Sequence, residues 1–72
     1  MNSTEIKTLI EAKLDGAQVT VNSNDNVHFE CEVVYPPFAK LKRIEHHQMV
    51  NAILADYIQS GEIHAISIKT RS

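Results

Sequence analysis

The sequence predicts an α+β fold in which two helices cover one face of a three-stranded mixed sheet. Its 72 residues suffice for a single domain that spans residues 1–72. Segments of helical and strand periodicity follow one another in the order helix, strand, strand, short helix, helix, strand. The first two strands are joined by a short polar turn, whereas the third follows a helical crossover. This order favours an antiparallel hairpin extended by one further strand.

The first helix is expected over residues 3–14. Asn2 can cap its first turn, and Glu5, three residues later, can complete a reciprocal capping box. The apolar positions at helical spacing are Ile6, Leu9, Ile10 and Leu14. Asp15-Gly16 ends this run.

A hairpin is expected next. Its first strand covers 17–22, where apolar and polar residues alternate, and its second covers about 27–35. The polar residues at 23–26 suit a turn, because Asn and Asp bond their own backbone and tolerate left-handed φ. The core face of the second strand is predicted to carry Val27, Phe29, Cys31, Val33 and Tyr35.

Pro36-Pro37 ends that strand, since neither proline can donate to a ladder. A short helical turn at 37–42 and a long helix at 43–59 are expected to follow, with Gly61 as the stop signal. The apolar stripe of the long helix is predicted to contain Ile44, His47, Val50, Leu54 and Ile58, widened by Ile53 and Tyr57. The last strand is expected at 62–69. Its core face is predicted to hold His64, Ile66 and Ile68.

Composition narrows the classes of function. With 43% hydrophobic and 22% charged residues the chain is typical of a globular domain. No apolar run approaches the ~18 residues of a membrane span, and the first residues lack signal-peptide character, so a cytoplasmic protein without membrane contact is expected. The formal net charge of −2 argues against bulk electrostatic binding of nucleic acid.

The sequence does not favour an enzyme. A domain of this size encloses a substrate poorly. Its one cysteine, Cys31, shares the parity of the core face of its strand, so we expect a buried, unreactive thiol with a structural role. A single cysteine also excludes an internal disulfide.

Four histidines offer the chemistry that remains. His47 lies on the predicted stripe of the long helix, where bonding to a backbone carbonyl is the structural interpretation. His28 faces away from the core beside the polar turn. His64 has core parity but lies at the edge of the core. It is either structural or part of a site completed by a partner, because one imidazole is never a complete metal site.

Lys40, Lys42 and Arg43 crowd the start of the long helix. Cations there oppose the helix dipole, which suggests an acidic or phosphate-bearing partner, although a solvated basic loop is the alternative. The chain contains no Gly-x-x-Gly and no pair of exposed aromatic residues for stacking bases, so the usual RNA-binding motif of this topology is missing.

Two segments resemble the BolA family, in its short, IbaG-like bacterial branch: residues 43–51 (RIEHHQMVN) and residues 63–70 (IHAISIKT). The His28-Phe29 and Pro37-Phe38 pairs match as well. The resemblance implies a class II KH-like fold. The chain departs from the family at Asp25, near which some members carry Cys or His, and at Phe38-Ala39-Lys40, which lacks the usual glycine.

The resemblance implies a non-enzymatic partner of monothiol glutaredoxins. A [2Fe–2S] cluster would be shared with the glutaredoxin and glutathione, and the isolated protein, a monomer or weak homodimer, would hold none. His64 is implied as cluster ligand and His28 is the nearest candidate for a second one. Lys40, Lys42 and Arg43 would help to dock the partner. The alternative is a KH-like, DNA-binding stress or transcription regulator that uses the same cations on phosphates.

Overall fold

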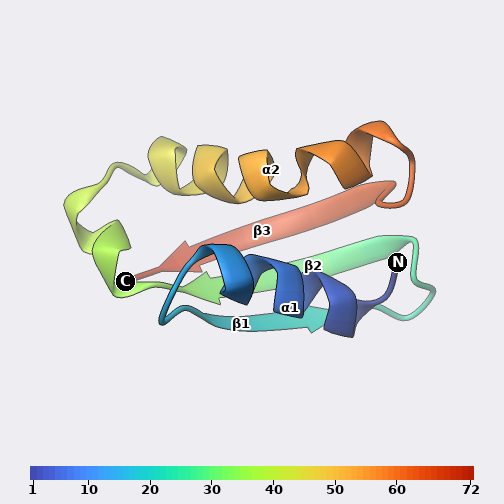
Figure 1. Ribbon diagram of the computed structural model, residues 1–72, viewed down its shortest axis with the longest axis horizontal. Helices are drawn as coiled ribbons and strands as arrows, with labels where there is room; N and C mark the ends of the chain where they lie inside the picture. Colours follow the sequence, from blue (N-terminus) through green and yellow to red (C-terminus); the bar gives the residue numbers. More distant parts are fainter.

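The computed structural model describes residues 1–72 and places two helices over one face of a three-stranded sheet (Figure 1). The elements are α1 (Ser3–Lys13), β1 (Gln18–Asn22), β2 (His28–Val34), the 3₁₀ helix η1 (Pro36–Lys40), α2 (Arg43–Gln59) and β3 (Ala65–Arg71). The central strand β2 pairs antiparallel with β1 and parallel with β3. The predicted α+β class and the mixed sheet are confirmed. No helix is long and apolar enough to span a membrane.

The predicted capping box at the start of α1 is confirmed. The side chain of Asn2 accepts a hydrogen bond from the Glu5 amide at 2.9 Å, and the Asn2 amide donates to the Glu5 carboxylate at 3.1 Å. Two of the amides that a helix start leaves without partners are thereby satisfied. Gly16 follows the helix with a φ of +85°, a conformation that costs glycine little, and so turns the chain into β1.

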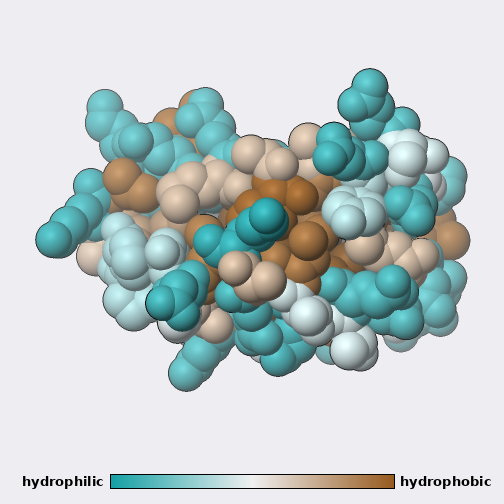
Figure 2. Space-filling model, in the orientation of Figure 1, coloured by the Kyte–Doolittle hydropathy of each residue, from teal (hydrophilic) through white to brown (hydrophobic).

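The core lies between the sheet and the two helices. Its eleven buried residues are Ile6, Ile10, Leu14, Val19, Phe29, Cys31, Val33, Phe38, Val50, Leu54 and Ile63. Alternate residues of β2 point into this layer, as the strand period predicts. Figure 2 shows apolar side chains gathered along the middle of the helical face, between α2 and α1, with polar side chains around them.

The prediction of which α2 residues are buried is wrong at both ends of the helix. Ile44 is 64% exposed and Ile58 is 40% exposed, whereas Val50 and Leu54 are fully buried. The helix is rotated so that His46, rather than His47, contacts the η1 segment. This orientation depends on where η1 packs, which the periodicity of α2 does not contain.

β3 begins at Ala65, three residues later than predicted. The segment before it folds back on α2, where the amide of Ile63 donates to the Tyr57 carbonyl at 3.0 Å, and Ile63 is buried. The alternation of core-facing and outward-facing side chains, which the sequence pattern extended from Ile66 back to residue 62, therefore fails at this bend. His64, expected on the core side, is exposed.

Candidate functional site

His28 and His64 lie at the same end of the sheet. His28 is the first residue of β2, and its register partner is Ala65, the residue that follows His64. The Ala65 amide also reaches the carbonyl of Val27, at 3.4 Å. Both imidazoles are exposed. The alternation of side chains along a strand would place the rings of His28 and His64 on opposite faces of the sheet. It does not apply to His64, because this residue precedes β3.

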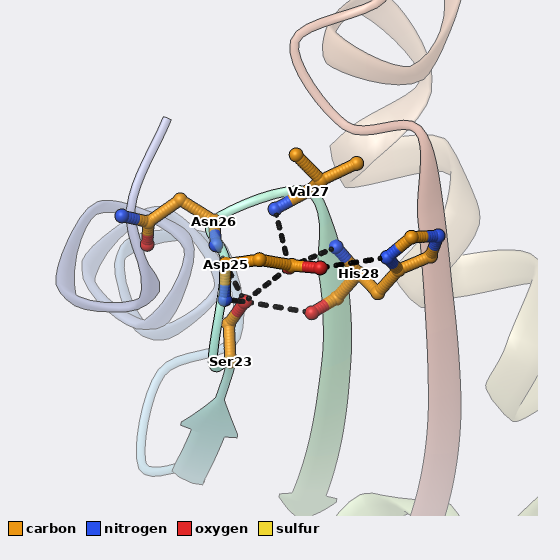
Figure 3. A network of polar contacts seen from close by, with 5 residues as sticks. All are labelled: Ser23, Asp25, Asn26, Val27 and His28. Carbon is orange, nitrogen blue, oxygen red and sulfur yellow. Dashed lines mark hydrogen bonds and ion pairs between the residues drawn. The ribbon is translucent and has the colours of Figure 1, made fainter.

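The loop between β1 and β2 is built around the Asp25 carboxylate (Figure 3). Its Oδ1 accepts hydrogen bonds from the amides of Val27 and His28, each at 2.9 Å. The Ser23 hydroxyl donates to the His28 carbonyl at 2.7 Å and accepts from the Asn26 amide at 2.9 Å. Asn26 adopts a φ of +57°, a left-handed conformation that asparagine tolerates well. These local bonds fix the start of β2.

Asp25 also orients the ring of His28. Its Oδ2 lies 2.9 Å from His28 Nδ1. The His28 amide, the His28 ring and the Val27 amide together hold the pKa of Asp25 well below its usual range. The ionised carboxylate can only accept, so Nδ1 carries the hydrogen in this pair. The lone pair of a neutral His28 ring is then on Nε2, which points away from the loop (Figure 3).

This end of the molecule is not a complete metal site. No three His, Cys, Asp or Glu side chains come together so that they could hold a metal ion. Cys31 is 3% exposed in the core, and burial raises the pKa of its thiol to about 11. The accessible nitrogen donors at this end are therefore the imidazoles of His28 and His64, and the exposed carboxylates of Asp25 and Glu62 lie at the same end.

His46 plays the structural part that the sequence assigned to His47. Its Nε2 lies 2.6 Å from the Phe38 carbonyl and 3.0 Å from the Leu41 carbonyl, so this nitrogen carries the hydrogen. Its Nδ1 lies 3.0 Å from the Thr70 hydroxyl, and its ring stacks on Phe38 with centroids 4.3 Å apart. A single side chain thus connects η1, α2 and β3.

The basic residues Lys40, Lys42 and Arg43 lie at the opposite end of the molecule from His64. The Thr70–His46 contact brings the end of β3 to the start of α2, whereas His64 precedes the first residue of β3. At about 3.3 Å per residue, the seven residues of β3 separate the two ends by roughly 20 Å.

The structure places two further cations, Lys69 and Arg71, at this basic end. The sequence pattern did not connect them with it. An open cleft of about 400 Å³ lies between the start of α2 and the end of β3. Its lining includes Arg43, His47, Lys69, Arg71, Thr70 and Glu32. The expected spacing of strand residues could have placed Lys69 and Arg71 on one face, but only the return of β3 along α2 brings them to Arg43.

Comparisons with known proteins agree with this fold. The family model described as BolA-like protein matches residues 5–72. The chain is 34% identical to a BolA-like protein of Dictyostelium discoideum, covering 94% of this chain and 68% of that protein. It is 35% identical to the acid stress protein IbaG of Escherichia coli K12, covering 96% of this chain and 81% of the relative.

The solved structure of a BolA homologue from Coxiella burnetii superimposes with a TM-score of 0.84. The two sequences are 33% identical, over all of this chain and 91% of that one. The family match over nearly the whole chain and the shared architecture lead to one conclusion: this protein belongs to the BolA-like family.

Proposed function

We propose that this protein is a non-enzymatic adaptor that holds one side of a [2Fe–2S] cluster in a complex with a monothiol glutaredoxin. The observation that carries the proposal is the placement of two exposed histidines at one end of the sheet, where the register partner of His28 is Ala65, the residue after His64. The cluster is cargo, completed by thiolates from the glutaredoxin and from glutathione.

The available donors suit such a shared cluster. Neutral imidazole is a competent iron ligand in mixed Cys/His [2Fe–2S] centres, where two histidines can replace two thiolates on one iron. His28 is held by a carboxylate on one nitrogen, the arrangement that orients many metal-binding histidines. Because no three His, Cys, Asp or Glu side chains of this chain come together, another molecule must supply the remaining ligands.

The role of each residue follows from its surroundings. His64 lies in a bend anchored on both sides, by the Ile63–Tyr57 backbone bond and by the start of β3. The rings of His28 and His46 are hydrogen-bonded within the chain, whereas that of His64 is not, so His64 is free to bind through either nitrogen. We assign His64 as the principal ligand and His28 as the second.

The test is anaerobic reconstitution of the cluster with a monothiol glutaredoxin and glutathione, followed by visible absorption and circular dichroism. His64→Ala is expected to abolish the mixed Cys/His spectrum while the complex without a cluster still forms. His28→Ala is expected to shorten the lifetime of the cluster to a smaller extent. The matched control is His47→Ala, which removes an imidazole at the other end and should leave the spectrum unchanged.

A wild-type spectrum and cluster lifetime in His64→Ala would contradict the proposed ligand role. Tight stoichiometric iron in the isolated protein would contradict the sharing of the cluster, since two imidazoles alone do not complete a tetrahedral site.

A further inference from the structure

We propose that the cleft between the start of α2 and the end of β3 is a second binding site, which takes a compact phosphate-bearing anion such as a diphosphate group. The observation that carries this proposal is that the tertiary structure brings together cations from two distant segments. Arg43 from α2 and Lys69 and Arg71 from β3 line one cleft, although they are separated by more than twenty residues in sequence. This site is independent of the proposed cluster-handling function.

The distribution of charge supports an anion at this position. The chain has seven Lys and Arg residues and a formal net charge of −2. Five of the seven lie on η1, at the start of α2 or at the end of β3: Lys40, Lys42, Arg43, Lys69 and Arg71. The other two, Lys7 and Lys13, are on α1, and Lys7 is paired with Glu11 at 3.1 Å.

The cations of the cleft are nearly free of internal partners. Their nearest counter-charge is Glu32, whose Oε2 lies 4.0 Å from Arg71 Nε, a loose pair in which both side chains are exposed. Such a pair contributes little to stability and yields readily to a better acceptor. The positive end of the α2 dipole adds to the field beside Arg43. Two guanidinium groups offer planar forks that match phosphate oxygens.

The shape and surroundings of the cleft favour a compact anion over a polymer. Its volume of about 400 Å³ is within the range of small-ligand sites. The adjoining outer face of the sheet carries the exposed Glu30, which would repel further phosphates of a nucleic acid strand. Because exposed aromatic residues for stacking bases are absent, little would compensate for that repulsion.

The distance between the two ends has a consequence for function. His64 lies roughly 13–16 Å along β3 from Ile68 and Lys69, the nearest residues of the cleft, which is beyond the Debye length of about 8 Å at physiological ionic strength. An anion in the cleft and a partner at His64 therefore need not compete. One molecule could carry both at once.

The experiment follows the backbone amide resonances of the full chain during titration with pyrophosphate at low salt. Shifts should concentrate at residues 43–47 and 69–71 and leave residues 25–28 and 64 unmoved. The double variant Arg43→Gln/Arg71→Gln should weaken binding about tenfold, as expected for the loss of two exposed charge pairs.

The matched control is Lys7→Gln/Lys13→Gln, which changes the net charge by the same amount on α1. Equal weakening by both double variants, or shifts spread over the whole surface, would show that only diffuse attraction operates and would overturn the proposal. Binding of a DNA duplex at this end that pyrophosphate cannot displace would overturn it in favour of a nucleic-acid surface. Neither result would bear on the shared cluster, since no cluster is present in the assay.

Discussion

The two adjacent histidines of α2 allow a direct test of the structure, because they have the same chemistry and different surroundings. His46→Ala removes a ring that is bonded to two carbonyls and a hydroxyl and is stacked on Phe38. His47→Ala removes a ring at the rim of the basic cleft. The structure predicts a large loss of stability in the first variant and a small one in the second.

The magnitude follows from the contacts of His46. Its Nε2 hydrogen is shared between two carbonyls, so we count one hydrogen bond on that side and one to Thr70 on the other. At about 1 kcal/mol of net stabilisation each, and about 1 kcal/mol for the stacked ring pair, the loss is about 3 kcal/mol. A domain of this length has a total stability of roughly 4–11 kcal/mol. His47→Ala should cost less than about 1 kcal/mol.

Equilibrium urea unfolding of both variants and the wild type measures these losses. With a slope of about 1 kcal/mol/M, the midpoint should fall by about 3 M urea for His46→Ala and by less than about 1 M for His47→Ala. A second variant, Thr70→Val, isolates the hydroxyl contact and should lose about 1 kcal/mol. Equal midpoints for the two histidine variants, or a larger loss in His47→Ala, would refute the orientation of α2 described above.

Three further predictions concern other parts of the fold. Cys31→Ala should cost about 1 kcal/mol of stability and leave the cluster proposed above intact. At pH 8 the native thiol should react with an alkylating reagent about a hundredfold more slowly than a free thiol, because burial raises its pKa to about 11. Rapid alkylation of the native protein would contradict this burial. Asp25→Asn should destabilise the protein at neutral pH. Because the folded state lowers the Asp25 pKa below its ordinary 3.8, the difference in the free energy of unfolding between variant and wild type should be complete above about pH 4 and shrink as the pH falls below that value. A difference that grows on acidification, measured by unfolding at a series of pH values, would refute the hydrogen-bond network. Asn2→Ala should cost about 1 kcal/mol through loss of the capping box, as read by thermal unfolding, and an unchanged melting temperature would show that the first turn of α1 is not held in this way.

His46 and His47 show what helical periodicity can predict and what it cannot. The helical spacing of Val50 and Leu54 correctly located the middle of the buried face of α2. Successive residues of a helix differ by 100°, so His46 and His47 flank that face almost equally. The carbonyls of Phe38 and Leu41, presented by η1, select His46. No pattern within α2 records their position.

The start of β3 is a second such case. Gly61 correctly marked the end of α2, where it adopts a φ of +86°. The strand itself can begin only where β2 offers partners, and β2 begins at His28, which pairs with Ala65. The preceding residues are instead held by α2, so Ile63 is buried and His64 is exposed. Strand alternation alone predicted the opposite, with His64 facing the core and Ile63 facing outward.

Short-range patterns were enough to predict the kinds of element, their order, the capping box of α1 and the alternate burial along β2, because each of these depends on residues that are near one another in the chain. The sequence also singled out His28, His64 and the cations at the start of α2 as candidate site residues, although it placed His64 on the core side. Which distant side chains meet depends instead on how the elements pack. The pairing of β3 with β2 places His64 at the same end of the sheet as His28, next to Ala65, which pairs with His28. The return of β3 along α2 brings Lys69 and Arg71 to Arg43. Contacts between distant segments arise from packing and strand register, which short-range patterns do not encode.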